Sequence, residues 1–141
     1  MKAISLWQPW ATLVATGAKR HETRSWETLY RGPIAIHAAK RWTSELKNIR
    51  SSDPFVANLP AGPLPFGAII AVARLVNCVR IDNDTTPTDA VEVVFGDYTH
   101  GRFRWDFDNV VLLDKPILFR GAQGLFDVPL IANPQEAKRE A

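Results

Sequence analysis

The segment from Gly67 to Ile81, GAIIAVARLVNCVRI, most constrains the fold of this chain. It is rich in β-branched and apolar side chains and has the strongest strand signal in the sequence. Further strands are expected at residues 2–6, 19–26, 33–38 and 102–114, with two short ones around the glycine turn RGAQG near residue 122. Short helices are expected at about 8–16, 40–50 and 86–95, with Pro9 and Pro87 in first turns. Residues 51–67 contain four prolines and two glycines, which predicts a long loop.

These strands and helices do not alternate as strand–helix–strand units. About six short strands with two or three short helices predict an α+β domain around a small curved sheet or barrel. The length of 141 residues suits one domain. We expect that domain to span residues 1–130 and to be followed by a polar C-terminal tail, residues 131–141, which is frayed at its end.

Composition excludes several classes of function. The formal net charge is only +2, so any affinity for nucleic acid must come from positive charge gathered on one face. The single cysteine, Cys78, allows no internal disulfide and is expected to be buried, and His21, His37 and His100 lack metal-ligand spacing. We therefore expect no metal and no cofactor. The sequence has no signal peptide and no apolar stretch approaching ~20 residues, which predicts a cytoplasmic protein away from membranes.

A crowd of polar side chains follows the first predicted helix in GAKRHETRSW, residues 17–26. In an extended segment side chains alternate, so Arg20, Glu22 and Arg24 are expected on one face and Lys19, His21 and Thr23 on the other. An ionised Glu22 can fix one guanidinium and leave the second arginine for a phosphate. The alternative is a solvated strand edge with weak ion pairs.

Aromatic side chains surround this segment in the sequence. Trp7 and Trp10 lie at the start of the first helix, where each is either part of the core or a flat surface for a base. Gln8 between them can read a base edge or hold an anion. Stacking of a base on a ring contributes about 1–3 kcal/mol. Further flat side chains are Trp26, Tyr30, Trp42, Tyr98 and Trp105.

Four blocks of the sequence resemble the ASCH family, named for homology to the activating signal cointegrator. The first, ISLWQPWATLVATGAKRHETRSW, carries the motif G-x-K-x-x-E-x-R as Gly17, Lys19, Glu22 and Arg24. The others are YRGPIAIHAAK, FGDYTHGRFRW and RGAQGLFDV, and the resemblance spans roughly residues 3 to 130.

The resemblance implies a PUA-like small β-barrel of about five to six strands with flanking short helices. It also implies a cleft between helix and barrel that is lined by the motif. The implied partners are RNA, single-stranded or as a nucleotide or nucleoside, and DNA. Ribonuclease activity is proposed for some members. A smaller branch deacetylates acetylcytidine with the motif lysine and a threonine three residues later, where this chain has Glu22.

Three hypotheses follow. In a binding module, phosphate is held by Arg20, Arg24 and Lys40. A base is met by Trp7, Gln8 and Trp10, and His37 closes the pocket.

In an enzyme, the catalytic set consists of Lys19, Glu22 and Tyr98. Lys19 is then either the base or nucleophile of an amidohydrolase, with Glu92 as a remote acid, or it stabilises, with Tyr98, the pentavalent phosphate in metal-independent RNA cleavage. In an interaction module, the acidic stretch 82–97 meets a protein partner, the alternative being a solvated loop and helix.

Overall fold

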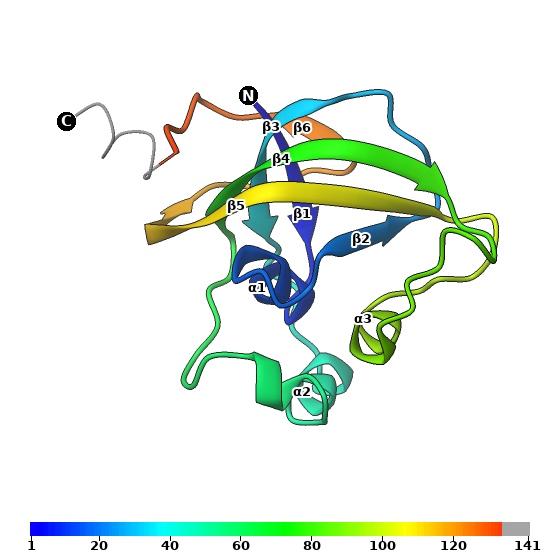
Figure 1. Cartoon of the computed structure of the whole chain (residues 1–141). Coiled ribbons are helices and arrows are strands. Elements are labelled where there is room, and N and C mark those ends of the chain that lie inside the picture. Colours follow the sequence, from blue (N-terminus) through cyan, green and yellow to red (C-terminus); the bar gives the residue numbers. More distant parts are fainter. Residues whose placement is uncertain (134–141) are drawn as a thin grey trace.

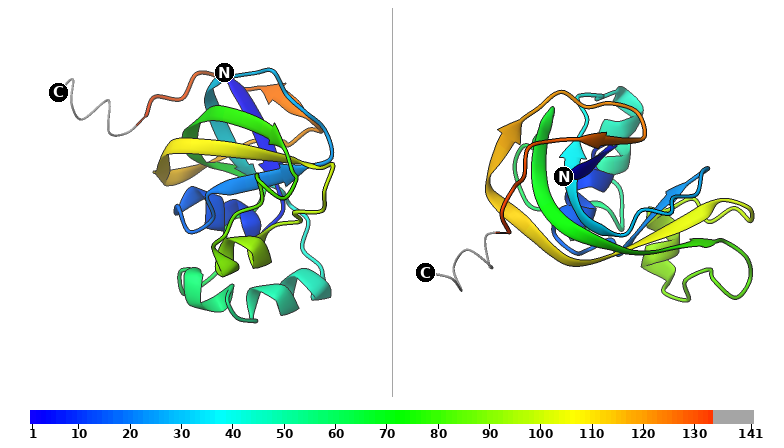
Figure 2. Two further views of the ribbon diagram at one scale, coloured as in Figure 1. Left: turned by 45° about the vertical axis from the view of Figure 1, so that its right-hand side comes forward. Right: turned by 90° about the horizontal axis from the view of Figure 1, so that it is seen from above.

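Six strands form one curved, mixed sheet in a computed structural model that describes residues 1–133 (Figure 1). The sheet order is β2–β5–β4–β3–β1–β6, with β1 and β3 parallel and all other neighbours antiparallel. The strand bounds are β1 Lys2–Leu6, β2 His21–Arg24, β3 Gly32–Ala38, β4 Ala68–Arg80, β5 Phe103–Leu118 and β6 Leu125–Asp127. The sheet curls into a half-barrel with β2 and β6 as its end strands (Figure 2). The α+β class and the small curved sheet are therefore confirmed.

The two longest strands produce the curvature. β4 and β5 pair over almost their whole length, and their register shifts at three places, between Ile69 and Ala71, Val72 and Arg74, and Leu75 and Asn77. Such irregularities bend a strand and increase its twist. One expected element is wrong: residues 116–118 form the end of β5 instead of a separate strand. β2 pairs only with residues 103–106 of β5, so Pro116 lies in an edge portion, where proline is tolerated.

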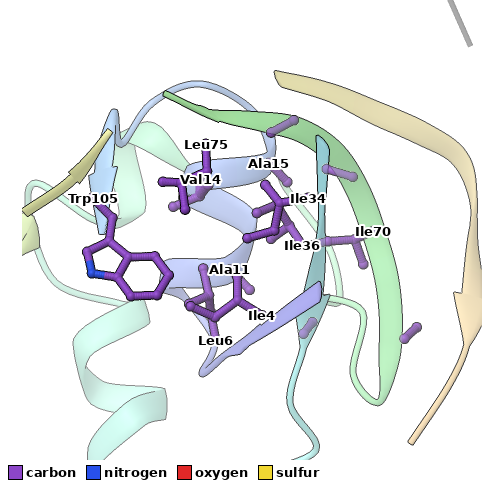
Figure 3. Packing of buried hydrophobic residues seen from close by; sticks show 14 of the residues in the cluster. Ile4, Leu6, Ala11, Val14, Ala15, Ile34, Ile36, Ile70, Leu75 and Trp105 are labelled. Atoms are coloured by element: carbon purple, nitrogen blue, oxygen red, sulfur yellow. The ribbon is translucent and has the colours of Figure 1, made fainter. Parts of the chain in front are cut away.

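The core is built by side-chain alternation on both faces of the sheet. In β3, Ile34 and Ile36 belong to the cluster beneath α1, whereas Ala35 between them packs in a second cluster on the other face. Trp105 of β5 is fully buried at the edge of the first cluster (Figure 3). Helix α1, Trp10–Ala15, covers this cluster and buries five of its six residues. Cys78 is also buried, as expected.

Capping residues set where the other helices begin. α2, Ser44–Arg50, starts after Thr43, whose hydroxyl accepts a hydrogen bond from the backbone N–H of Leu46. α3, Ala90–Phe95, starts after Asp89, whose carboxylate accepts from two backbone N–H groups. Both helices are shorter than predicted because these caps fix the first turn later than the composition indicated. A short 3-10 turn, Val56–Asn58, interrupts the proline-rich loop.

The helices gather at one end of the half-barrel (Figure 1). A small apolar cluster of Leu13, Phe55 and Phe95 joins α1 to the proline-rich loop and to α3. Among residues 1–133 no helix is long and apolar enough to cross a membrane. The predicted boundary at residue 130 stays a prediction, and most of the predicted frayed tail lies outside the described residues.

Replacing Trp105 tests the core. Its ring is 0% exposed, lies 4.8 Å from the Trp26 ring centroid in an edge-on arrangement, and its Nε1–H donates to Trp26 O at 3.4 Å. Trp105→Ala is expected to lower the free energy of unfolding by about 3–5 kcal/mol because it leaves a large cavity. Urea denaturation followed by circular dichroism measures the change. Leu29→Ala, at an 88% exposed position, is the control and should change it by less than about 0.5 kcal/mol.

Candidate functional site

A cleft of about 540 Å³ opens where α1 begins, along β2 and beside the end of α3. It combines flat aromatic side chains with groups that donate and accept hydrogen bonds. Its lining consists of Ser5, Trp7, Trp10, Glu22, Thr23, Arg24, Ser25, Trp26, Val94, Phe95, Gly96, Asp97 and Arg102. The cleft therefore combines aromatic surfaces with hydrogen-bonding groups, a lining that suits a flat, polar ligand.

One wall of the cleft is an ordered row of charges. Glu22 Oε2 lies 3.3 Å from Arg24 Nη2, and its other oxygen, Oε1, lies 3.4 Å from Lys19 Nζ. Arg24 Nη2 also donates to the backbone oxygen of Ser5 at 2.8 Å, which ties β2 to the end of β1. Glu22 thus joins two cations, and the positions of all three side chains depend on one another.

The ammonium group of Lys19 lies behind this wall. Its side chain is 1% exposed, and Nζ donates to the backbone oxygen of His21 as well as contacting Glu22. The chain reaches this position because Gly17 adopts a left-handed backbone conformation (φ +82°) after α1, and the N–H of Lys19 then donates to Leu13 O at 2.9 Å. A buried ammonium is stable only when it is paired and hydrogen-bonded, and both conditions hold.

A second ion pair forms another wall of the cleft. Arg102 Nε lies 3.4 Å from Asp97 Oδ2, and Arg102 Nη2 donates to Thr23 O at 3.3 Å. Thr23 Oγ1 in turn accepts from the N–H of Asp97 at 3.2 Å. Reasoning from the sequence missed Arg102, although it lies in FGDYTHGRFRW, one of the four blocks that carried the family resemblance.

Three tryptophans frame the opening. Trp7 is 50% exposed, and the guanidinium carbon of Arg41 lies 4.5 Å from its ring centroid, a cation–π contact. Trp10 packs edge-on against Phe55, and Trp26 against Trp105. Trp10 and Trp26 are therefore anchored in the core at one side while they line the cleft at the other.

Comparison with known proteins identifies the family. The model of the ASCH domain matches residues 4–115, most of the chain. The protein belongs to the ASCH domain family. Similar solved structures are the ASCH protein of Zymomonas mobilis and a point-substituted variant of it. The first is 17% identical, with a TM-score of 0.54 and coverage of 99% of this chain and 92% of that one; the variant is 19% identical with the same score and coverage. At this identity the likeness concerns the fold. No curated protein matches the sequence.

Four of the residues predicted for the site meet in the cleft of this ASCH domain: Trp7, Trp10, Glu22 and Arg24. Arg20 does not join them, because β2 begins only at His21 and the alternation does not extend back to residue 20. Arg20 instead lines a separate surface pocket together with Glu92. The Glu92 carboxylate accepts from the backbone N–H groups of Arg20 and His21 at 3.1–3.2 Å, so it fixes the turn that carries the motif.

Tyr98 lies beneath the cleft instead of lining it. It is 9% exposed, its ring sits against Gly96, and its hydroxyl has no hydrogen-bond partner among the described residues. Burial, together with the negative charge of Glu92, raises the pKa of Tyr98 well above its ordinary value. The phenol therefore stays protonated at neutral pH and can act only as a hydrogen-bond donor or acceptor.

Gln8, His37 and Lys40 lie elsewhere. Gln8 is 0% exposed, its amide hydrogens go to Thr12 Oγ1 and Pro65 O, and its oxygen accepts from Thr12 N–H, so it stabilises the start of α1. His37 and Lys40 line a different cavity, which shares Ser5 with the cleft. Among residues 1–133 no group of three or more His, Cys, Asp or Glu side chains is placed to hold a metal ion.

The pair of Lys19 and Glu22 can be tested by a double-mutant cycle. Glu22→Gln leaves a buried ammonium without its counter-charge and is expected to lower the free energy of unfolding by about 3 kcal/mol. Lys19→Met/Glu22→Gln removes both charges and should recover a large part of that loss. Urea denaturation of the parent protein, Glu22→Gln, Lys19→Met and the double variant gives the coupling free energy of the two charges. Additive losses in the double variant would show that the two charges do not interact.

Proposed function

We propose that this ASCH domain binds single-stranded RNA and takes one nucleotide into the cleft, with its base among the tryptophans. The ASCH family is generally linked to RNA binding. The observation that carries the proposal is the half-exposed ring of Trp7 at the mouth of a cleft whose walls hold fixed donors and acceptors. The Arg41 guanidinium lies over this ring, and a base stacked on the same tryptophan would meet an aromatic surface with a cation beside it.

The polar groups of the cleft suit the edge of a base better than a run of phosphates. Glu22 and Asp97 supply carboxylate acceptors, and Arg24 and Arg102 supply donors. Sequence-specific recognition of single-stranded RNA uses such groups on the Watson–Crick edge of an unstacked base. A matched DNA oligonucleotide tests whether the 2′-hydroxyl contributes to binding, since this group distinguishes the two nucleic acids.

One observation favours metal-independent ribonuclease activity as a second candidate. The Glu22 carboxylate shares the cleft with two guanidinium groups, those of Arg24 and Arg102. A carboxylate can accept the proton of a 2′-hydroxyl, and cations can stabilise the pentavalent phosphate that follows. In this arrangement Lys19 acts by holding Glu22 in place. Tyr98 lies beneath the wall, where it is one of the buried groups around the motif.

The other two functions have less support. An acetylcytidine amidohydrolase needs the amine of Lys19 at the substrate, whereas here Nζ is covered by Glu22 and by the backbone oxygen of His21. A protein-docking role for residues 82–97 needs exposed, available carboxylates. Most of them serve the fold instead: Asp82 accepts from the N–H groups of residues 84 and 85, Asp89 caps α3, and Glu92 holds the motif turn.

Removing the Trp7 ring tests RNA binding. Trp7→Ala is expected to weaken binding of a single-stranded oligonucleotide roughly 5- to 150-fold, because stacking contributes about 1–3 kcal/mol. Trp7→Phe keeps an aromatic face, so its affinity should lie between those of the parent protein and of Trp7→Ala. Fluorescence anisotropy with a labelled RNA measures the dissociation constants, and thermal melting checks that each variant is folded. Equal affinity of all three proteins would contradict the proposal.

Incubation in EDTA tests catalysis. We expect cleavage of single-stranded RNA whose rate falls by ~10² or more in Lys19→Met/Glu22→Gln, because a general base contributes about that much. This variant removes the base without leaving a buried unpaired charge. Gel analysis of labelled RNA and chromatography of acetylcytidine follow both reactions. Deacetylation that is lost in Lys19→Ala would favour the amidohydrolase. If neither the RNA nor the acetylcytidine is converted, both enzymatic functions are rejected and RNA binding is the remaining function.

A further inference from the structure

We infer that the RNA strand continues from the cleft over Arg41 into a second, basic cavity, so that the protein binds several consecutive nucleotides and not an isolated nucleotide. The inference rests on the proposed function and extends it. The second cavity has a volume of about 990 Å³ and lies between the ends of β1 and β3 and the segment of residues 118–123. Its lining includes Lys40, Phe66, Phe119, Arg120 and Gln123.

The two cavities adjoin at the end of β1. Ser5 lines both of them: its backbone oxygen accepts from Arg24 of the cleft wall, and its hydroxyl contacts His37 of the second cavity. Arg41, over the exposed ring of Trp7, follows Lys40 directly in the chain. A path from the cleft to the second cavity therefore passes Trp7 and Arg41.

Charge is distributed unequally along this path. In the cleft Glu22 pairs with Lys19 and Arg24, and Asp97 pairs with Arg102, so most of the charge is neutralised internally. In contrast, the second cavity has no carboxylate in its lining, and Lys40, Arg41 and Arg120 make no ion pair within residues 1–133. Uncompensated cations are what the phosphates of a strand require, whereas the neutralised cleft suits a base.

The second cavity is held in shape by a buried hydrogen-bond chain. His37 is 1% exposed, and burial lowers its pKa, so the ring is neutral at pH 7. Its Nε2–H donates to Phe119 O at 2.7 Å, and Nδ1 accepts from the Ser5 hydroxyl at 2.8 Å. Gly121 lies so close that a Cβ there would come within 2.8 Å of the His37 ring. His37 thereby fixes the segment that carries Arg120.

The aliphatic stem of Lys40 packs against the backbone as well. A Cβ on Gly67 would lie 2.8–2.9 Å from carbons of the Lys40 side chain, so the backbone at Gly67 supports its aliphatic stem. The ring of Phe66 beside it lies 5.1 Å from that of Trp42 and offers an aromatic surface next to the cations. Cations and rings together are the combination with which proteins track single strands without regard to sequence.

Chain-length dependence tests the inference. Binding of a nucleoside monophosphate, followed by quenching of tryptophan fluorescence, is compared with binding of oligonucleotides from two to about eight residues. The test variant is Lys40→Gln/Arg120→Gln. Lys47→Gln/Arg74→Gln removes the same two charge types at exposed positions outside the three cavities and is the control.

The expected result has two parts. Affinity of the parent protein rises at least tenfold from monophosphate to oligonucleotide, and the test variant loses most of this gain while it binds the monophosphate normally. For the test variant, the plot of log K against log salt becomes less steep by about 1.4. Two phosphate contacts are lost, and each contributes about 0.7 to the slope in a single strand. The control variant should keep both the gain in affinity from monophosphate to oligonucleotide and the salt dependence of the parent protein.

Three outcomes would overturn the inference. Equal affinity for monophosphate and oligonucleotide would reject the second cavity while the proposed function of the cleft stands. Absence of binding to either ligand would reject the proposed function and this inference with it. A polyglutamate peptide that binds the second cavity more tightly than the oligonucleotide does, with loss in the test variant, would assign these cations to an acidic protein partner.

Discussion

The buried ammonium of Lys19 is the constraint on which the cleft depends. An ammonium removed from water costs several kcal/mol unless it is paired and hydrogen-bonded, so Glu22 has to face it. With one oxygen toward Lys19, the Glu22 carboxylate turns its other oxygen to Arg24, and Arg24 reaches the backbone of Ser5 at the end of β1. One buried charge thus orders a wall that joins two strands which are not neighbours in the sheet.

Buried polar contacts also hold the two walls at a fixed separation. Glu92 in α3 accepts from the backbone N–H groups of Arg20 and His21, just before and within β2. Thr23 of β2 accepts from the N–H of Asp97, and its carbonyl accepts from Arg102. The short helix α3 is therefore attached to β2 through Glu92 within it and through the backbone of Asp97 just after it. A cleft with such walls is formed before any ligand arrives, which lowers the entropic cost of binding.

The sequence predicted local structure better than the grouping of side chains. The pattern of β-branched residues located β3 and β4, and the motif located Glu22 and Arg24. Arg20 was expected beside Arg24, but β2 begins only at His21. The backbone N–H of Arg20 instead donates to the Glu92 carboxylate. His37 and Lys40 were assigned to the same pocket as Trp7. The parallel pairing of β1 with β3 places Ser5 beside His37, whose side chain lines the other cavity. A strand register of this kind is not encoded in any local pattern.

In the proposed RNA complex, the two cavities divide the work of recognition according to their charge. In nucleic-acid recognition, contacts to phosphates supply affinity and register, and contacts to base edges supply discrimination. In the cleft, ion pairs hold the charged groups in defined orientations, as contacts to a base edge require. The same pairing leaves the cleft with little net charge. Outside it, Lys40, Arg41 and Arg120 make no ion pair within residues 1–133, and Arg41 lies over the ring of Trp7 at the boundary. If the proposal holds, a small domain with a net charge of only +2 attracts phosphate on one side of the base by gathering its unpaired cations there.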